Sequence, residues 1–187
     1  MPGKAARTIF EIAEDQLGYF TAAQARAAGV KPVTLVKMGQ RGTVQRVSWG
    51  VYRLPNFPVL PYAQFMAASL WPQARRIGIQ GVISHASALS LYDLSDASPA
   101  QVHITLPKAT RLNRAVPAYL IVHRADLPPT DVQQVHGLPV TTPERSIRDC
   151  HAATMGGSVV RGAIDDAERE GWLKPVQAAK LRDELLR

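Results

Sequence analysis

Residues 21–54 constrain the fold of this 187-residue chain more than any other stretch. Thr21 is a good N-cap for a short helix, and Gly29 stands where that helix needs a left-handed residue to end. Pro32 suits the first turn of a second helix, and Gly50 then divides two β-rich runs. Two helices joined by a tight turn and followed by a hairpin predict a winged helix-turn-helix.

The charge of this stretch indicates a polyanionic partner. The chain has 22 Lys and Arg against 15 Asp and Glu, a net charge of +7. Residues 16–92 contain eight Lys or Arg and no acidic residue. Acidic side chains near phosphates weaken binding, so the gap favours nucleic acid as the partner over chance or a generally basic composition.

A winged helix-turn-helix places its second helix in the major groove and holds its register through phosphates. Val33, Val36 and Leu35 are expected to pack inward from that helix, with Met38 outward. We expect the DNA-binding side chains to be Lys31, Thr34, Lys37, Arg41, Arg46 and Arg53, with Arg75 and Arg76 as additional phosphate contacts. A winged helix that binds only protein is the alternative.

The whole chain is predicted to be α+β. A proline-punctuated join after residue 57 separates an N-terminal winged helix-turn-helix domain, residues 1–57, from a C-terminal domain, residues 58–187. In the second domain, Ser84 is a candidate N-cap, and four short β-rich runs predict a small antiparallel sheet with flanking helices. These runs are residues 101–106, 118–123, 131–135 and 138–140.

Nothing in the sequence has the spacing of a catalytic or metal site. The chain has one cysteine, Cys150, and the histidines show no HxH or HxxxH pattern. The five histidines are His85, His103, His123, His136 and His151. We therefore expect no catalytic residue, no metal, no cofactor and no enzymatic activity; a nucleic-acid-processing enzyme that uses His85 or His123 is the less favoured alternative.

The remaining features predict a cytoplasmic protein. No apolar run is long enough to cross a membrane, the N-terminus lacks the pattern of a signal peptide, and a single cysteine fits a reducing compartment. Near the C-terminus, a helix is expected to carry four acidic side chains, Asp165, Asp166, Glu168 and Glu170. They form either a solvated face or a docking site for a basic partner.

Five short blocks in the same order resemble the AbiEi family of antitoxins from type IV toxin–antitoxin systems. The blocks are WGVYRL (49–54), ISHASAL (83–89), HITLP (103–107), VHRADL (122–127) and GLPVTTP (137–143). The resemblance implies a transcriptional autorepressor that binds inverted repeats in its own promoter, as a dimer or as two copies side by side. It also implies a C-terminal domain that opposes a nucleotidyltransferase toxin.

Overall fold

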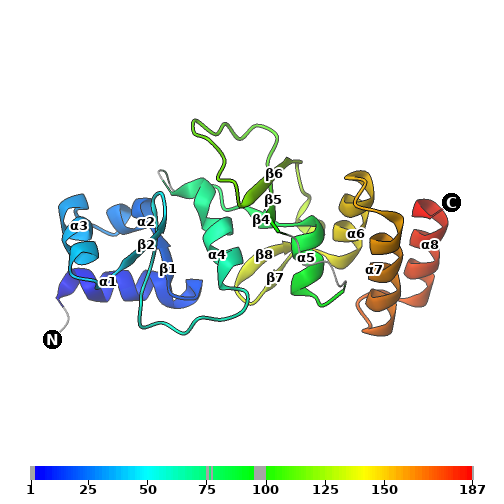
Figure 1. Ribbon diagram of the computed structural model, residues 1–187, viewed down its shortest axis with the longest axis horizontal. Coiled ribbons are helices and arrows are strands. Elements are labelled where there is room, and N and C mark those ends of the chain that lie inside the picture. The colour runs from blue at the N-terminus through cyan, green and yellow to red at the C-terminus, as the bar shows by residue number, and fades with distance from the viewer. Residues whose placement is uncertain (1–2, 75, 77, 95–99, 187) are drawn as a thin grey trace. The chain divides into compact units, whose positions relative to one another are not determined.

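The computed structural model describes residues 3–74, 76, 78–94 and 100–186, and its elements are labelled in Figure 1. The chain divides into two compact units. Unit 1 comprises Met1–Gly81 together with His136–Leu138, and unit 2 comprises Val82–Val135 and Pro139–Arg187. The boundary expected after residue 57 falls inside unit 1. None of the helices in the described ranges is both long enough and apolar enough to span a membrane.

Unit 1 combines helices with a three-stranded antiparallel sheet in the order β1-β3-β2. Its helical part fits a helix-turn-helix. The short β1 carries no sequence signal, because three residues cannot show an alternating pattern. The elements are α1 (Lys4–Ala13), η1 (Glu14–Gln16), β1 (Tyr19–Thr21), α2 (Ala22–Ala27), α3 (Pro32–Gln40), β2 (Gln45–Ser48), β3 (Val51–Arg53), α4 (Ala63–Leu70) and η2 (Trp71–Gln73).

The turn between α2 and α3 is built by the residues that the sequence indicated. The backbone N–H of Gln24 donates to the Thr21 hydroxyl at 3.1 Å, and the backbone N–H of Thr21 donates to the Gln24 side chain at 2.8 Å. These two bonds form a capping box at the start of α2. Gly29 ends the helix with a left-handed φ of 84°, and Pro32 is the first residue of α3. The predicted helix boundaries are confirmed here.

The hairpin of β2 and β3 turns at Gly50, as expected. Gly50 has a φ of +75°, and a Cβ at this position would lie 2.9 Å from the Ala74 Cβ and 3.0 Å from the Ala74 carbonyl oxygen. Both the backbone conformation and the close approach of Ala74 therefore require glycine.

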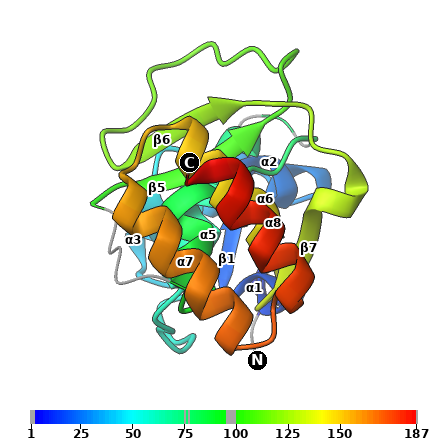
Figure 2. The same cartoon turned by 90° about the vertical axis from the view of Figure 1, so that its right-hand side faces the viewer.

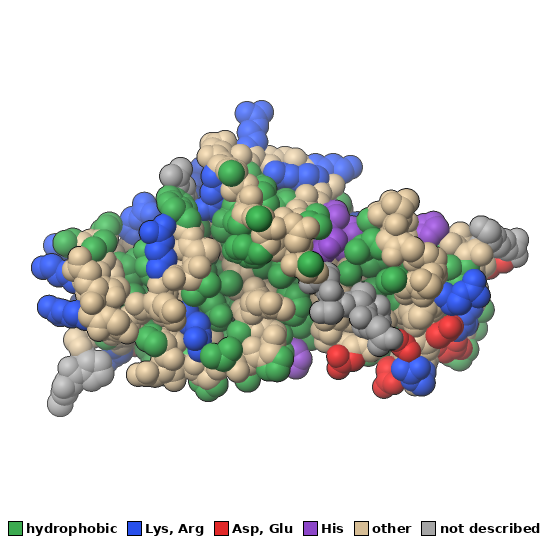
Figure 3. Space-filling view, viewed as in Figure 1, with side chains coloured by type: hydrophobic (Ala, Val, Ile, Leu, Met, Phe, Trp, Pro, Cys, Tyr) green, Lys and Arg blue, Asp and Glu red, His purple; other side chains and the backbone are tan. Residues whose placement is uncertain are grey.

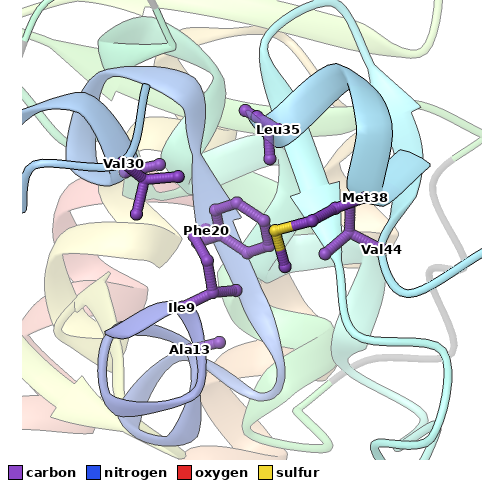
Figure 4. Close-up of a cluster of buried hydrophobic side chains, with 8 residues drawn as sticks. Ile9, Ala13, Phe20, Val30, Leu35, Met38 and Val44 are labelled. Carbon is purple, nitrogen blue, oxygen red and sulfur yellow. The ribbon is translucent and has the colours of Figure 1, made fainter. Parts of the chain in front are cut away.

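A cluster of buried side chains holds α1, α2 and α3 against the sheet of unit 1 (Figure 4). Phe20, on β1, is in the middle of this cluster, is fully buried, and stacks on Tyr52 with ring centroids 5.6 Å apart. The other buried members are Ile9, Ala13, Ala25, Val30, Leu35, Met38 and Val44.

The side of α3 that packs inward differs in part from the prediction. Leu35 and Met38 are buried, whereas Val33 and Val36 are 58% and 57% exposed. The expectations for Val33, Val36 and Met38 were therefore wrong, and that for Leu35 is confirmed. The reason is helical phase: at 100° per residue, positions 35 and 38 lie on one side, and positions 33, 36, 37 and 40 lie on the opposite side.

Unit 2 is organised by a five-stranded sheet in the order β6-β5-β4-β8-β7, whose β8 begins within the segment assigned to unit 1. Strands β5 and β6 are joined by the loop 107–119, which is visible in Figure 1. The elements are β4 (Val82–Ile83), α5 (His85–Leu91), β5 (Val102–Leu106), β6 (Leu120–Arg124), η3 (Pro129–Asp131), β7 (Val132–Val135), β8 (Leu138–Thr141), α6 (Pro143–Ala152), α7 (Gly157–Arg169) and α8 (Pro175–Leu185).

The predicted antiparallel sheet is in fact mixed. The pair β4 and β5 is antiparallel, but β5 with β6 and β4 with β8 are parallel. A parallel neighbour needs a connection long enough to return the chain to the start of the preceding strand, and the loop 107–119 provides it. A strand has the same length and hydrophobic pattern whether it pairs in parallel or antiparallel. The sequence pattern therefore did not distinguish a mixed sheet from an antiparallel one.

Helices α6, α7 and α8 pack side by side (Figure 2). The acidic side chains of α7 are paired within the chain: Arg182 lies 2.7 Å from Asp165 and 2.6 Å from Glu168, and Arg169 pairs with Asp166 and Glu170. This pairing favours the solvated face over a docking site. On α6, Cys150 is fully buried, and burial raises the pKa of its thiol to about 12.

Candidate DNA-binding surface

Four of the predicted DNA-binding side chains are exposed cations on α3 and the hairpin. Lys31 is the N-cap residue of α3, Lys37 lies within it, Arg41 follows it directly, and Arg46 is on β2. All four are exposed. None of the four forms an ion pair with any residue in the described part of the chain. A phosphate would therefore meet these cations without competition from an internal carboxylate.

Arg53 occupies a different setting, although it is on the same hairpin. It is half-buried, and its guanidinium donates a hydrogen bond to the carbonyl oxygen of Phe57. The guanidinium carbon also lies 6.0 Å from the centre of the Tyr19 ring. Burial raises the pKa of Tyr19, and the positive charge of Arg53 opposes that rise. In this arrangement Arg53 holds the end of the hairpin in place.

The other predicted contacts are less exposed or fall outside the hairpin. Thr34 is half-buried on α3 and lies between Lys31 and Lys37 in the sequence. Arg76 is exposed, and Arg75 lies outside the described residues.

Two apolar side chains on the outer side of α3 were missed by the sequence reading. Val33 and Val36 lie on the same side of the helix as Lys37 and are more than half exposed. The signal was available: once Leu35 and Met38 are taken as the buried pair, helical spacing places both valines outside. The outer side of α3 therefore carries both positive charge and exposed apolar side chains.

The two units differ in how their charges are distributed. On the face drawn in Figure 3, Lys and Arg side chains extend from both units, whereas Asp and Glu side chains are seen on the side of unit 2. Residues 16–92, which include α2, α3 and the hairpin, contain no acidic residue. Nine ion pairs are formed by residues in the range 131–184, all in unit 2.

Comparison with solved structures supports the fold. The crystal structure of the RV2827C protein from Mycobacterium tuberculosis superposes with a TM-score of 0.57 and 20% sequence identity, over 98% of this chain and 72% of that chain. At this identity the likeness establishes an α+β fold and carries no function. A comparison with curated protein sequences found no match.

Comparison with protein families bears directly on the candidate surface. Residues 7–55 match the family described as "Transcriptional regulator, AbiEi antitoxin". The matched range begins in α1 and ends just after β3, so it contains every candidate cation from Lys31 to Arg53. The resemblance found in the sequence is confirmed for this range: residues 7–55 are similar to the family of AbiEi antitoxin transcriptional regulators.

Proposed function

We propose that unit 1 binds double-stranded DNA as a winged helix-turn-helix, with α3 as the recognition helix and the β2–β3 hairpin as the wing. The DNA-binding domain would be residues 1–57, and residues 58–187 would form the regulatory domain. The element order α1-β1-α2-α3-β2-β3 supports this assignment. A helix with its side chains is about 10–12 Å across, which suits a major groove about 12 Å wide.

The observation that carries the proposal is the set of four exposed, unpaired cations, Lys31, Lys37, Arg41 and Arg46, in a region without acidic residues. Each can neutralise a phosphate without first breaking an internal ion pair. Neutralised phosphates release condensed counterions, which makes binding favourable and dependent on salt. The match of this same region to a family of transcriptional regulators supports DNA as the polyanion.

Binding to duplex DNA from upstream of the gene is expected to fall steeply with salt. If the four cations each neutralise one phosphate, log K changes with log salt with a slope of about −3.6, so doubling the salt weakens binding roughly 12-fold. Fluorescence anisotropy at several salt concentrations measures the slope, with a scrambled duplex of equal length as the control. Absence of saturable binding at low salt would contradict the proposal and leave unit 1 as a protein-interaction module.

We further propose that the chain represses its own promoter in the cytoplasm and is the antitoxin of a type IV pair with a nucleotidyltransferase toxin. Inverted repeats in the promoter would be read by a dimer, since a two-fold DNA site matches a two-fold protein. The family match of residues 7–55 supports this role. Co-expression with a nucleotidyltransferase encoded beside it tests the role: growth should recover, and a promoter reporter should be repressed. Continued toxicity and an unrepressed reporter would rule it out.

Val33 and Val36 are expected to contact thymine methyl groups, because exposed apolar side chains on a recognition helix meet the C5 methyl in the major groove. Replacing both by alanine should weaken specific binding about tenfold, or ~1.4 kcal/mol, and leave binding to scrambled DNA unchanged. Replacing thymine by uracil should weaken binding of the wild-type protein by a similar factor. The same replacement should cause little further loss of affinity in the double alanine variant. Val176→Ala, 81% exposed in unit 2, is the control. Equal affinity of wild type for thymine and uracil duplexes would refute the contact.

A further inference from the structure

Three histidines from three separate elements of unit 2 come together. His85 is the first residue of α5, His103 lies on β5 and His123 lies on β6. One ring nitrogen from each lies within 4.8 Å of the others. His103 Nδ1 and His123 Nε2 are 3.0 Å apart, and the ring centroids of His85 and His123 are 3.5 Å apart. Sequence spacing did not reveal this cluster, because 18 and 20 residues separate its members.

The sheet brings the imidazoles to one face. In the parallel pair of β5 and β6, His103 is opposite Ile121 and Thr105 is opposite His123, so both histidines and Thr105 are on the same face. Strand β4 ends beside β5, where the backbone N–H of Ser84 donates to the His103 carbonyl oxygen at 3.1 Å. The residue after Ser84 is His85, which therefore begins α5 next to the other two rings.

The backbone and the neighbours of His85 fix its position. His85 has a φ of +54°, a left-handed conformation that is uncommon outside glycine and recurs at functional sites. Ser84 occupies the N-cap position of α5, but its hydroxyl makes no capping bond. Instead the Ser84 Oγ lies 3.0 Å from His85 Nδ1 and accepts a hydrogen bond from the Thr105 hydroxyl at 2.8 Å. With Nδ1 engaged in this way, Nε2 of His85 is left for a ligand.

The electrostatic surroundings suit a cation. Burial, followed by the neighbouring imidazoles, lowers the pKa of His85 to about 3, and burial and His123 lower the pKa of His103 to about 4. Imidazole binds metal through the lone pair of its neutral form. The negative charge of Asp149 acts on His123, and the Asp149 Oδ2 is buried with no hydrogen-bond partner among the described residues. Such unpaired buried oxygens are rare, whereas the other oxygen of this carboxylate, Oδ1, accepts a hydrogen bond from Arg145 Nε at 2.8 Å.

We propose that His85, His103 and His123 bind one zinc ion. Zinc is favoured over magnesium or calcium because neutral imidazole is a preferred zinc ligand, whereas the other two ions prefer oxygen. Zinc–nitrogen bonds of about 2.1 Å at tetrahedral angles separate two ligand nitrogens by roughly 3.4 Å. The 3.0 Å between His103 Nδ1 and His123 Nε2 is close to that value, so the ion would take the place of the shared proton, which moves to the other nitrogen of the donor ring.

Formation of the site requires one side-chain movement. The His85 ring is stacked on His123, with an angle of 16° between the ring planes, and it must tilt to aim its nitrogen at the same point. His123 is only partly buried, which gives an ion a route from solvent. Three protein ligands leave a fourth position for water.

The test uses the untagged full-length chain, stripped of metal and titrated with Zn²⁺ against a chromogenic chelator, with native mass spectrometry for stoichiometry. We expect one zinc per chain. His123→Gln and His103→Gln should each lower the affinity at least about 100-fold, and Ser84→Ala, which keeps all three imidazoles, should lower it roughly tenfold or more. His151→Gln, an exposed histidine on α6, is the matched control and should bind zinc as wild type does.

Two results would overturn the site: no zinc uptake by the wild-type chain at micromolar concentration, or wild-type affinity in His123→Gln. Circular dichroism and the protection of the buried Cys150 thiol from a thiol reagent verify that each variant is folded. Co²⁺ provides a second readout, since a four-coordinate site gives intense visible absorption that the His123→Gln variant should lack.

Discussion

Replacing Lys37 and Arg41 together by alanine is expected to weaken binding to specific DNA about 100-fold, or ~2.7 kcal/mol. Both side chains are exposed on or next to α3 and have no ion-pair partner in the described chain. If α3 binds DNA as proposed, their loss removes contacts with DNA and breaks no ion pair among the described residues. The salt slope should also become shallower by roughly two, one for each lost phosphate contact. Anisotropy with the upstream duplex measures both quantities.

The matched control for this variant is Arg161→Ala with Lys174→Ala. Both residues are exposed in unit 2, and the double replacement changes the net charge by the same amount. Wild-type affinity in the control would show that position, and not total charge, determines binding. Wild-type affinity in the variant at Lys37 and Arg41 would contradict the assignment of α3 to the groove. Exposed substitutions of this kind change stability by only about 0.5 kcal/mol, so both proteins should remain folded.

Phe20→Ala is expected to lower the free energy of unfolding of unit 1 by roughly 3–5 kcal/mol. Phe20 is fully buried and is in the middle of the cluster that joins α1, α3 and the sheet, so alanine leaves a cavity there. The stacking of its ring on Tyr52 is lost as well. Phe10→Ala, on the same helix as Ile9 but 50% exposed, is the control and should cost less than about 1 kcal/mol.

Urea unfolding of this variant needs separate probes, because two compact units need not unfold together. In a Trp172→Phe background, fluorescence comes from Trp49 and Trp71, both in unit 1. Reaction of the buried Cys150 thiol reports on unit 2. The midpoint of the fluorescence transition should fall in Phe20→Ala relative to Phe10→Ala. An unchanged midpoint would show that Phe20 does not stabilise unit 1.

Local signals in the sequence were sufficient for the helix-turn-helix. Thr21, Gly29, Pro32 and Gly50 each act through the conformation of their own backbone or a neighbour three residues away, so their roles can be read from the sequence. The inward side of α3 was misjudged because the four apolar residues among positions 33–38 fit more than one helical phase. Packing against Phe20 and Val44 selects the phase with Leu35 and Met38 inside.

Long-range arrangements could not be predicted in this way. The direction of β6 depends on how the loop 107–119 returns, and strand periodicity is the same for either direction. The histidine cluster depends on the register of that pair, because a shift of β6 by one residue against β5 would turn His123 to the face opposite His103. Likewise, nothing local indicates that Arg53 is held by Phe57 and Tyr19, whereas Arg46, seven residues earlier, is exposed.

The segment His136–Leu138, which joins β7 to β8, belongs to unit 1 although 54 residues, 82–135, separate it from the rest of that unit. Within unit 1, His136 stacks on Tyr62 with ring centroids 4.1 Å apart. During synthesis on the ribosome this contact forms only after residues 82–135 have been translated. A nascent chain that terminates before residue 136 therefore has an incomplete unit 1, and completion of this unit is tied to translation of residues 82–135.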